Sequence, residues 1–133
     1  MERHVENTFK VAEYLQNHDQ VAWVNYAGLK DHSDYERAQR YMKGKPSAIM
    51  SFGLKGGYEA GVKFYDALQL IKRLVNIGDT RSLACHPAST THRQMNTDEQ
   101  AQAGVTPEMI RLSIGIEHID DIIADIEQAL NAK

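Results

Sequence analysis

Hydrophobic and polar residues follow two different periods along this chain, and each period predicts a different kind of element. A spacing of three to four residues, as at Val5, Phe9 and Ala12, is typical of the buried face of a helix. Alternation at every second residue, or a β-branched and aromatic run such as Val21 to Tyr26, favours a strand. The two periods predict helices over 5–18, 34–42, 60–74, 97–104 and 119–130, and strands over 21–26, 48–55, 81–85 and 109–116.

The longest helical pattern follows Gly57 and continues for about four turns. Its apolar stripe consists of Ala60, Phe64, Ala67, Leu68, Ile71 and Leu74. Two shorter helices begin with a capping-box signature, in which a side chain that accepts a hydrogen bond is followed three positions later by Glu or Gln. These signatures are Ser33 with Glu36 and Thr97 with Gln100. They predict where the second and fourth helices start.

Helices and strands alternate along the chain, and the strands are short and apolar on one side only. Strands of this kind bury a single face of a sheet. The pattern therefore predicts the α+β class, with a small, mainly antiparallel sheet, helices packed on one face, and the other face free.

One strand carries an arginine in an otherwise apolar run. Alternation places the isoleucines and the leucine on one face and Arg111, Ser113 and Gly115 on the other. The apolar set is Ile110, Leu112, Ile114 and Ile116. A guanidinium stays charged and needs an anion. Two interpretations are open: an ion pair with an internal Asp or Glu, or a site where the carboxylate or phosphate of a ligand docks.

Composition limits the class of partner. The chain has 133 residues and a formal charge of −3, from 15 basic and 18 acidic residues. This length fits one domain with a proper core, and the charge balance disfavours nucleic acid and anionic membranes as partners. Cys85 is the single cysteine, which excludes an internal disulfide and favours a reducing compartment. Without an apolar leader or a membrane-spanning run, we expect a soluble, cytoplasmic protein.

Other candidate chemistries have less support in the sequence. His86 and His92 lie in a polar loop with no cysteine pair or acidic cluster that would complete a metal site. Ser82 and Ser89 lack the glycine context of a nucleophile elbow, and Lys55 at a strand end is typical of a surface lysine. What remains is recognition of a small carboxylate, with catalysis left to a cofactor or to another part of a protein.

Three segments carry a resemblance to a known family. Residues 82–92, 110–117 and 120–125 read SLACHPASTTH, IRLSIGIE and DDIIAD. They resemble the C-terminal region of the pyridoxal-phosphate-dependent Cys/Met metabolism enzymes. Further segments, VAWVNY at 21–26, FGLKGG at 52–57 and NIGD at 76–79, are most similar to the O-acetylhomoserine sulfhydrylase branch of that family. The resemblance covers essentially the whole chain.

The resemblance implies a set of roles. Arg111 is expected to pair with the substrate's α-carboxylate, Asn76 to assist from the same side, and Thr91 to have a weaker polar role. No residue of the chain is expected to be catalytic, to bind the cofactor or to bind a metal. The fold implied is that of the C-terminal domain of fold-type I pyridoxal phosphate enzymes, with residues 1–133 forming this single domain.

The resemblance also implies what lies outside the chain. The full-length enzyme is expected to carry pyridoxal phosphate on a large domain absent here, to be a homotetramer, and to convert O-acetylhomoserine and sulfide or methanethiol into homocysteine or methionine and acetate. The isolated chain is expected to bind no cofactor and to be inactive. Two alternatives stay open: another branch, such as cystathionine γ-synthase or methionine γ-lyase, and a stand-alone module that senses amino acids.

Overall fold

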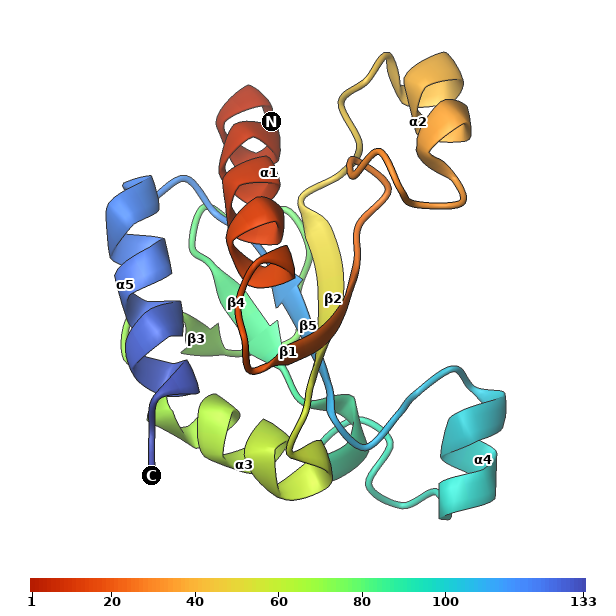
Figure 1. The fold of residues 1–133 in the computed structure, drawn as a ribbon, viewed down its shortest axis with the longest axis vertical. Helices are drawn as coiled ribbons and strands as arrows, with labels where there is room; N and C mark the ends of the chain where they lie inside the picture. The colour runs from red at the N-terminus through yellow and green to blue at the C-terminus, as the bar shows by residue number, and fades with distance from the viewer.

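The computed structural model describes residues 1–133 as five helices and five strands, drawn in Figure 1. The helices are α1 (Glu2–Gln16), α2 (Tyr35–Met42), α3 (Gly57–Ala67), α4 (Thr97–Gln102) and α5 (Ile119–Leu130), with one 3-10 turn, η1 (Pro87–Ser89). The strands are β1 (Val21–Asn25), β2 (Ile49–Leu54), β3 (Lys72–Arg73), β4 (Leu83–Cys85) and β5 (Met109–Ser113). None of the helices combines the length and the apolar character needed to cross a membrane.

The strands form one sheet in the order β1-β2-β5-β4-β3. The pairs β1–β2, β2–β5 and β5–β4 are antiparallel, and only the short edge pair β3–β4 is parallel. The predicted α+β class with a mainly antiparallel sheet is therefore confirmed.

The core lies between the sheet and three helices. Alternate residues of the two central strands, such as Phe52 of β2 and Leu112 of β5, are fully buried in a cluster with side chains from α1, α3 and α5. The ring of Phe64 on α3 meets that of Phe52 edge to face, with 5.4 Å between centroids. Burial of each such side chain contributes roughly 1.5–3 kcal/mol to folding. Figure 1 shows α2 and α4 standing away from this layer, on the connections between strands.

The third helix is shorter than its apolar stripe predicts. It ends at Ala67, where Leu68 adopts an extended conformation with ψ of 135°, and residues 72–73 join the sheet as β3. The reason is a contact distant in sequence, because the Asp125 carboxylate of α5 accepts hydrogen bonds from three consecutive amides. These amides belong to Gln69, Leu70 and Ile71, with N–O distances of 2.9, 3.0 and 2.8 Å. They cannot also donate within a helix, so the prediction of a helix to residue 74 is wrong.

The strand that carries Arg111 is also shorter than predicted. Ile114 still donates its amide to Ala48 next to β2, but the Ile116 amide donates to the Thr80 carbonyl at 2.9 Å. The chain has therefore left the sheet by this point, and Ile116 is 44% exposed instead of joining the core.

The start of α4 lies one residue before the predicted capping box. Asn96 accepts a hydrogen bond from the Glu99 amide, and the Glu99 carboxylate accepts one from the Asn96 amide, each at 2.9 Å. Gln100 does not cap the helix, because its side-chain amide donates to the carbonyl of His92 at 2.8 Å.

The capping signature predicted for α2 is not used either. The helix begins after Asp34, and no side chain caps it. Its end is sharp, because Lys43 adopts the left-handed conformation with φ of 54°.

Candidate functional site

Arg111 lies at the centre of the sheet, on the face opposite the core. Its strand neighbours are Ser51 on β2 and Cys85 on β4, and Ser51 in turn pairs with Asn25 on β1. Residues paired across strands point to the same face of a sheet. Asn25, Ser51, Arg111 and Cys85 therefore form one row that crosses four strands.

An open hollow of about 310 Å³ lies over part of this row. It is lined by Asn25, Tyr26, Ala27, His32, Ile49, Met50, Ser51, Met109 and Arg111. The aliphatic and aromatic side chains give the hollow an apolar wall. The polar groups come from three strands and from the loop that follows β1.

The guanidinium of Arg111 has no acidic partner in the chain. The ion pairs of the structure involve other cations, and none includes Arg111. Arg111 is only partly buried. Of the two interpretations that the sequence leaves open, the internal ion pair is thus absent from the structure. The geometry leaves paired donors that match a carboxylate or phosphate from outside.

The two residues predicted to share a face with Arg111 do not line the hollow. Ser113 is buried, and its hydroxyl has no hydrogen-bond partner. Gly115 lies against the backbone of the loop between β3 and β4, where a Cβ atom would collide with the carbonyl oxygen of Thr80 and the carbonyl carbon of Arg81. This end of the face is covered by the chain itself, so Arg111 is the only one of these three residues that lines the hollow.

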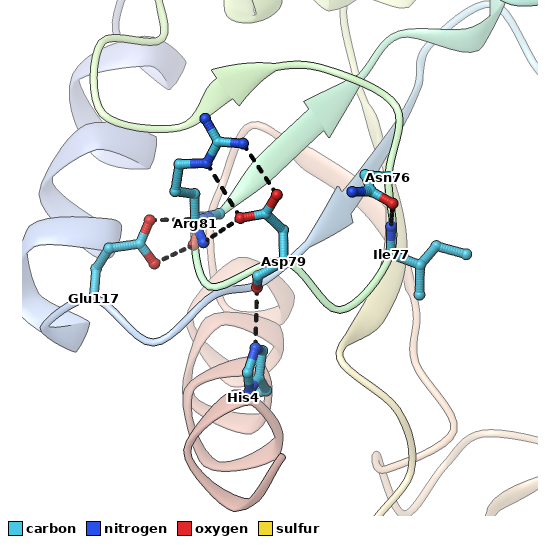
Figure 2. A network of polar contacts seen from close by, with 7 residues as sticks. His4, Asn76, Ile77, Asp79, Arg81 and Glu117 are labelled. Atoms are coloured by element: carbon cyan, nitrogen blue, oxygen red, sulfur yellow. Dashed lines mark hydrogen bonds and ion pairs between the residues drawn. The ribbon is translucent and has the colours of Figure 1, made fainter.

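Asn76 lies in the loop between β3 and β4 and is exposed. Its side-chain oxygen accepts a hydrogen bond from the amide of the next residue, Ile77, at 2.9 Å. Figure 2 shows Asn76 apart from the polar contacts that hold the other end of its loop. It does not line the hollow of Arg111, so the structure does not bring these two predicted residues into one pocket.

A network of polar contacts fixes the loop downstream of Asn76 (Figure 2). Arg81 donates from two nitrogens to the Asp79 carboxylate, and this guanidinium lowers the pKa of Asp79 from 3.8 to about 2. His4 of α1 contacts the Asp79 carbonyl at 3.0 Å. The Glu117 carboxylate accepts hydrogen bonds from the amide and hydroxyl of Ser82, at 2.6 and 2.8 Å. The loop is therefore tied both to α1 and to the segment that follows β5.

Thr91 is exposed and its hydroxyl contacts the Nδ1 atom of His92 at 2.8 Å. The segment before it is more regular than the predicted polar loop, because residues 87–89 form the turn η1.

His86 is fully buried, and its ring nitrogens contact the Ser89 hydroxyl and the Pro107 carbonyl at 2.7 and 2.8 Å. Both ring nitrogens of His86 are thus engaged in hydrogen bonds within the protein. No cluster of three potential metal ligands occurs in the structure.

Sequence reasoning did not single out Asn25, Ser51 and His32 as residues of the Arg111 hollow. Asn25 and Ser51 are polar residues of predicted strands, and alternation places Ser51 on the face opposite Met50 and Phe52. That they stand beside Arg111 depends on strand order and register, which periodicity does not show.

The residues around Arg111 suit a carboxylate but not the attachment of pyridoxal phosphate. A Schiff base needs a lysine amine, and no lysine lines this hollow. The free guanidinium and the hydroxyl of Ser51 offer hydrogen bonds to an anion, but no group that forms a covalent bond with a cofactor.

The sequence of this chain is similar to those of known proteins. The model of the Cys/Met metabolism PLP-dependent enzyme family matches residues 1–131. An O-acetyl-L-homoserine sulfhydrylase of Thermus thermophilus is 60% identical over 129 residues, which are 97% of this chain and 31% of that protein. A homocysteine synthase of Schizosaccharomyces pombe is 50% identical over 130 residues, which are 98% of this chain and 30% of that protein. The chain thus spans about a third of the length of the relatives it matches.

A solved structure shares the fold over nearly the whole chain. It is a putative O-acetylhomoserine (thiol)-lyase from Campylobacter jejuni, crystallised with a pyridoxyl phosphate adduct on a lysine. It has a TM-score of 0.91 and 41% sequence identity, and the match covers 98% of this chain and 31% of that one.

Proposed function

Because the chain belongs to the Cys/Met metabolism PLP-dependent enzyme family, we propose that it is the C-terminal, substrate-binding domain of an O-acetylhomoserine sulfhydrylase. The reaction is the conversion of O-acetylhomoserine and sulfide or methanethiol into homocysteine or methionine and acetate. Relatives named for this activity, at 50 to 60% identity, support the proposal.

The observation that carries the proposal is the free guanidinium of Arg111. A guanidinium in the middle of a sheet face, with an apolar wall beside it and no internal acid, suits the α-carboxylate of an amino acid. Paired hydrogen bonds fix both the position and the orientation of a carboxylate. Such a contact contributes to catalysis by holding the reacting part of the substrate in place.

The rest of the machinery is proposed to lie outside this chain. Pyridoxal phosphate belongs to the family, and the residues around Arg111 offer no lysine to attach it. We therefore assign the cofactor to the part of the enzyme that the relatives have in addition. Asn76 and Thr91 are both exposed and available to a substrate held by that part. The homotetramer implied by the resemblance stays a prediction.

The test uses a chimeric enzyme. In the Thermus thermophilus relative, the segment that matches this chain is replaced by this chain, and the rest of the relative is kept. We expect this chimera to turn over O-acetylhomoserine with sulfide. Arg111→Ala should lower kcat/KM by about a hundredfold or more, because the carboxylate loses its paired donors. Arg111→Lys should retain part of the activity, because it keeps the charge but not the planar pair.

The matched control is Arg37→Ala, which removes an arginine of α2 that is 80% exposed at its side chain. It should leave kcat/KM unchanged. An inactive chimera, or an Arg111→Ala chimera within threefold of the unchanged one, would contradict the proposal. Assays with cysteine as the thiol, and with methionine alone, separate this branch from the cystathionine γ-synthase and methionine γ-lyase branches.

A further inference from the structure

Three polar groups in the Arg111 hollow have no hydrogen-bond partner within the protein. They are the side-chain nitrogen of Asn25, the hydroxyl of Ser51 and the guanidinium of Arg111. The strand register places them in one row across β1, β2 and β5. A row of unused donors on an otherwise apolar wall is the arrangement by which a pocket fixes the orientation of a ligand.

His32 fixes the orientation of the Asn25 side chain. The Asp34 amide donates to Nδ1 of His32 at 3.0 Å, so this nitrogen is an acceptor and the ring hydrogen lies on Nε2. Nε2 then donates to the side-chain oxygen of Asn25 at 2.6 Å. The oxygen of the amide is turned to His32, and the NH₂ group of Asn25 is left free to donate elsewhere.

The spacing of the row favours a ligand with an acceptor at each end. Asn25 and Arg111 are separated by two strand spacings, which is roughly 9–10 Å between their backbones. One carboxylate cannot engage both side chains across that distance without drawing them together. An amino acid that carries an acyl ester at the end of its side chain has a carboxylate at one end and an ester carbonyl at the other.

We propose that Asn25, oriented by His32, determines specificity for the acyl group of the substrate. Arg111 holds the α-carboxylate, and the NH₂ group of Asn25 donates a hydrogen bond to the ester carbonyl of an O-acyl amino acid. This inference rests on the function proposed above and extends it to the part of the substrate that leaves. The hollow of about 310 Å³ has the size of a site for a small molecule.

The test uses the chimeric enzyme and compares two measurements for each variant. The first is kcat/KM for O-acetylhomoserine, and the second is the inhibition constant of norleucine, an amino acid of similar length without an acyl group. Asn25→Asp keeps the shape of the side chain and exchanges the donor NH₂ for an acceptor oxygen of a charged carboxylate. It should lower kcat/KM by about ten- to a hundredfold, and the inhibition constant should stay within twofold.

Three further variants serve as comparisons and as a control for Asn25→Asp. His32→Ala should shift the first measurement in the same direction by less, because Asn25 keeps its donor but loses its fixed orientation. Arg111→Lys should weaken both measurements. Asn96→Asp, at the start of α4, should change neither, because Asn and Asp cap a helix about equally well. Thermal melts of all variants should coincide with that of the unchanged chimera.

The outcomes separate the two proposals. If the unchanged chimera does not use O-acetylhomoserine, both proposals fail. If Arg111→Lys weakens both measurements while Asn25→Asp changes neither, or changes both equally, the role of Asn25 is overturned and the proposed function stands.

Discussion

At the scale of the residue, Arg111 differs from the arginines that form ion pairs, because it has no acidic partner. Arg37 and Arg81 are exposed, and each pairs with a carboxylate two or three residues away in sequence. Arg111 has a strand on each side, and its strand neighbours are neutral. Period-2 alternation predicts that it faces away from the core. The absence of an internal acid depends on which strands lie beside it.

Asp79 is the residue for which a pH dependence is expected. Hydrogen bonds from the side chain and backbone of Arg81 lower the pKa of Asp79 from 3.8 to about 2. Since the pKa is lower in the folded state, this carboxylate stabilises the fold above about pH 4. The contribution is lost as the pH falls through the folded-state value.

This pH dependence can be measured by following the Asp79 carboxyl by NMR between pH 5 and pH 1.5. Arg81→Ala should raise its midpoint toward 3.8, because the partner cation and its hydrogen bonds are removed. The control Arg37→Ala should leave the midpoint near 2. A low midpoint that survives Arg81→Ala would show that another contact is responsible.

At the scale of the element, α3 and α5 differ in how far periodicity describes them. The terminal pattern predicts a helix over 119–130, and the structure has α5 at Ile119–Leu130. The apolar stripe of α3 continues past Ala67, but the chain does not stay helical. The stripe still marks buried side chains, since Leu68 and Ile71 enter the core from the extended segment. In residues 68–74 the apolar period therefore predicts which side chains are buried but not the backbone conformation. The hydrogen bonds to Asp125 determine that conformation.

Asp125 is therefore expected to contribute strongly to stability. It is 6% exposed and accepts hydrogen bonds from three backbone amides. Asp125→Asn replaces one acceptor oxygen by a donor and leaves at least one of these three amides without its acceptor. The free energy of unfolding should fall by about 2 kcal/mol or more.

Urea denaturation of the chain measures this change. The control Asp121→Asn alters an exposed acid in the first turn of the same helix and should cost only about 0.3–1 kcal/mol. Equal losses for the two variants would contradict the role assigned to Asp125.

At the scale of the whole molecule, helices α1, α3 and α5 cover one face of the sheet, while Arg111 opens onto the other. A pocket on one sheet face leaves a small ligand largely in contact with water. Binding must offset the loss of translational and rotational freedom, which part of a pocket does not achieve. We therefore expect the chain by itself to be inactive.

The activity of the isolated chain can be tested directly. Mixed with pyridoxal phosphate, O-acetylhomoserine and sulfide, it should form no homocysteine, whereas the chimera under the same conditions should. Chromatography of the products measures both. Product formed by the isolated chain, and lost in Arg111→Ala, would show that the 133 residues contain a complete site.

The sequence by itself determined the class of fold, most helices and strands, the family, and the side of the sheet on which Arg111 lies. These features follow from local period and from short motifs, which are properties of neighbouring residues. The tertiary structure decided where α3 ends, because that depends on Asp125, more than fifty residues away. It also decided that Asn25, Ser51 and His32, and not Asn76 or Thr91, line the hollow with Arg111. The physical reason is that strand order and register bring distant segments together, and no local pattern encodes that choice.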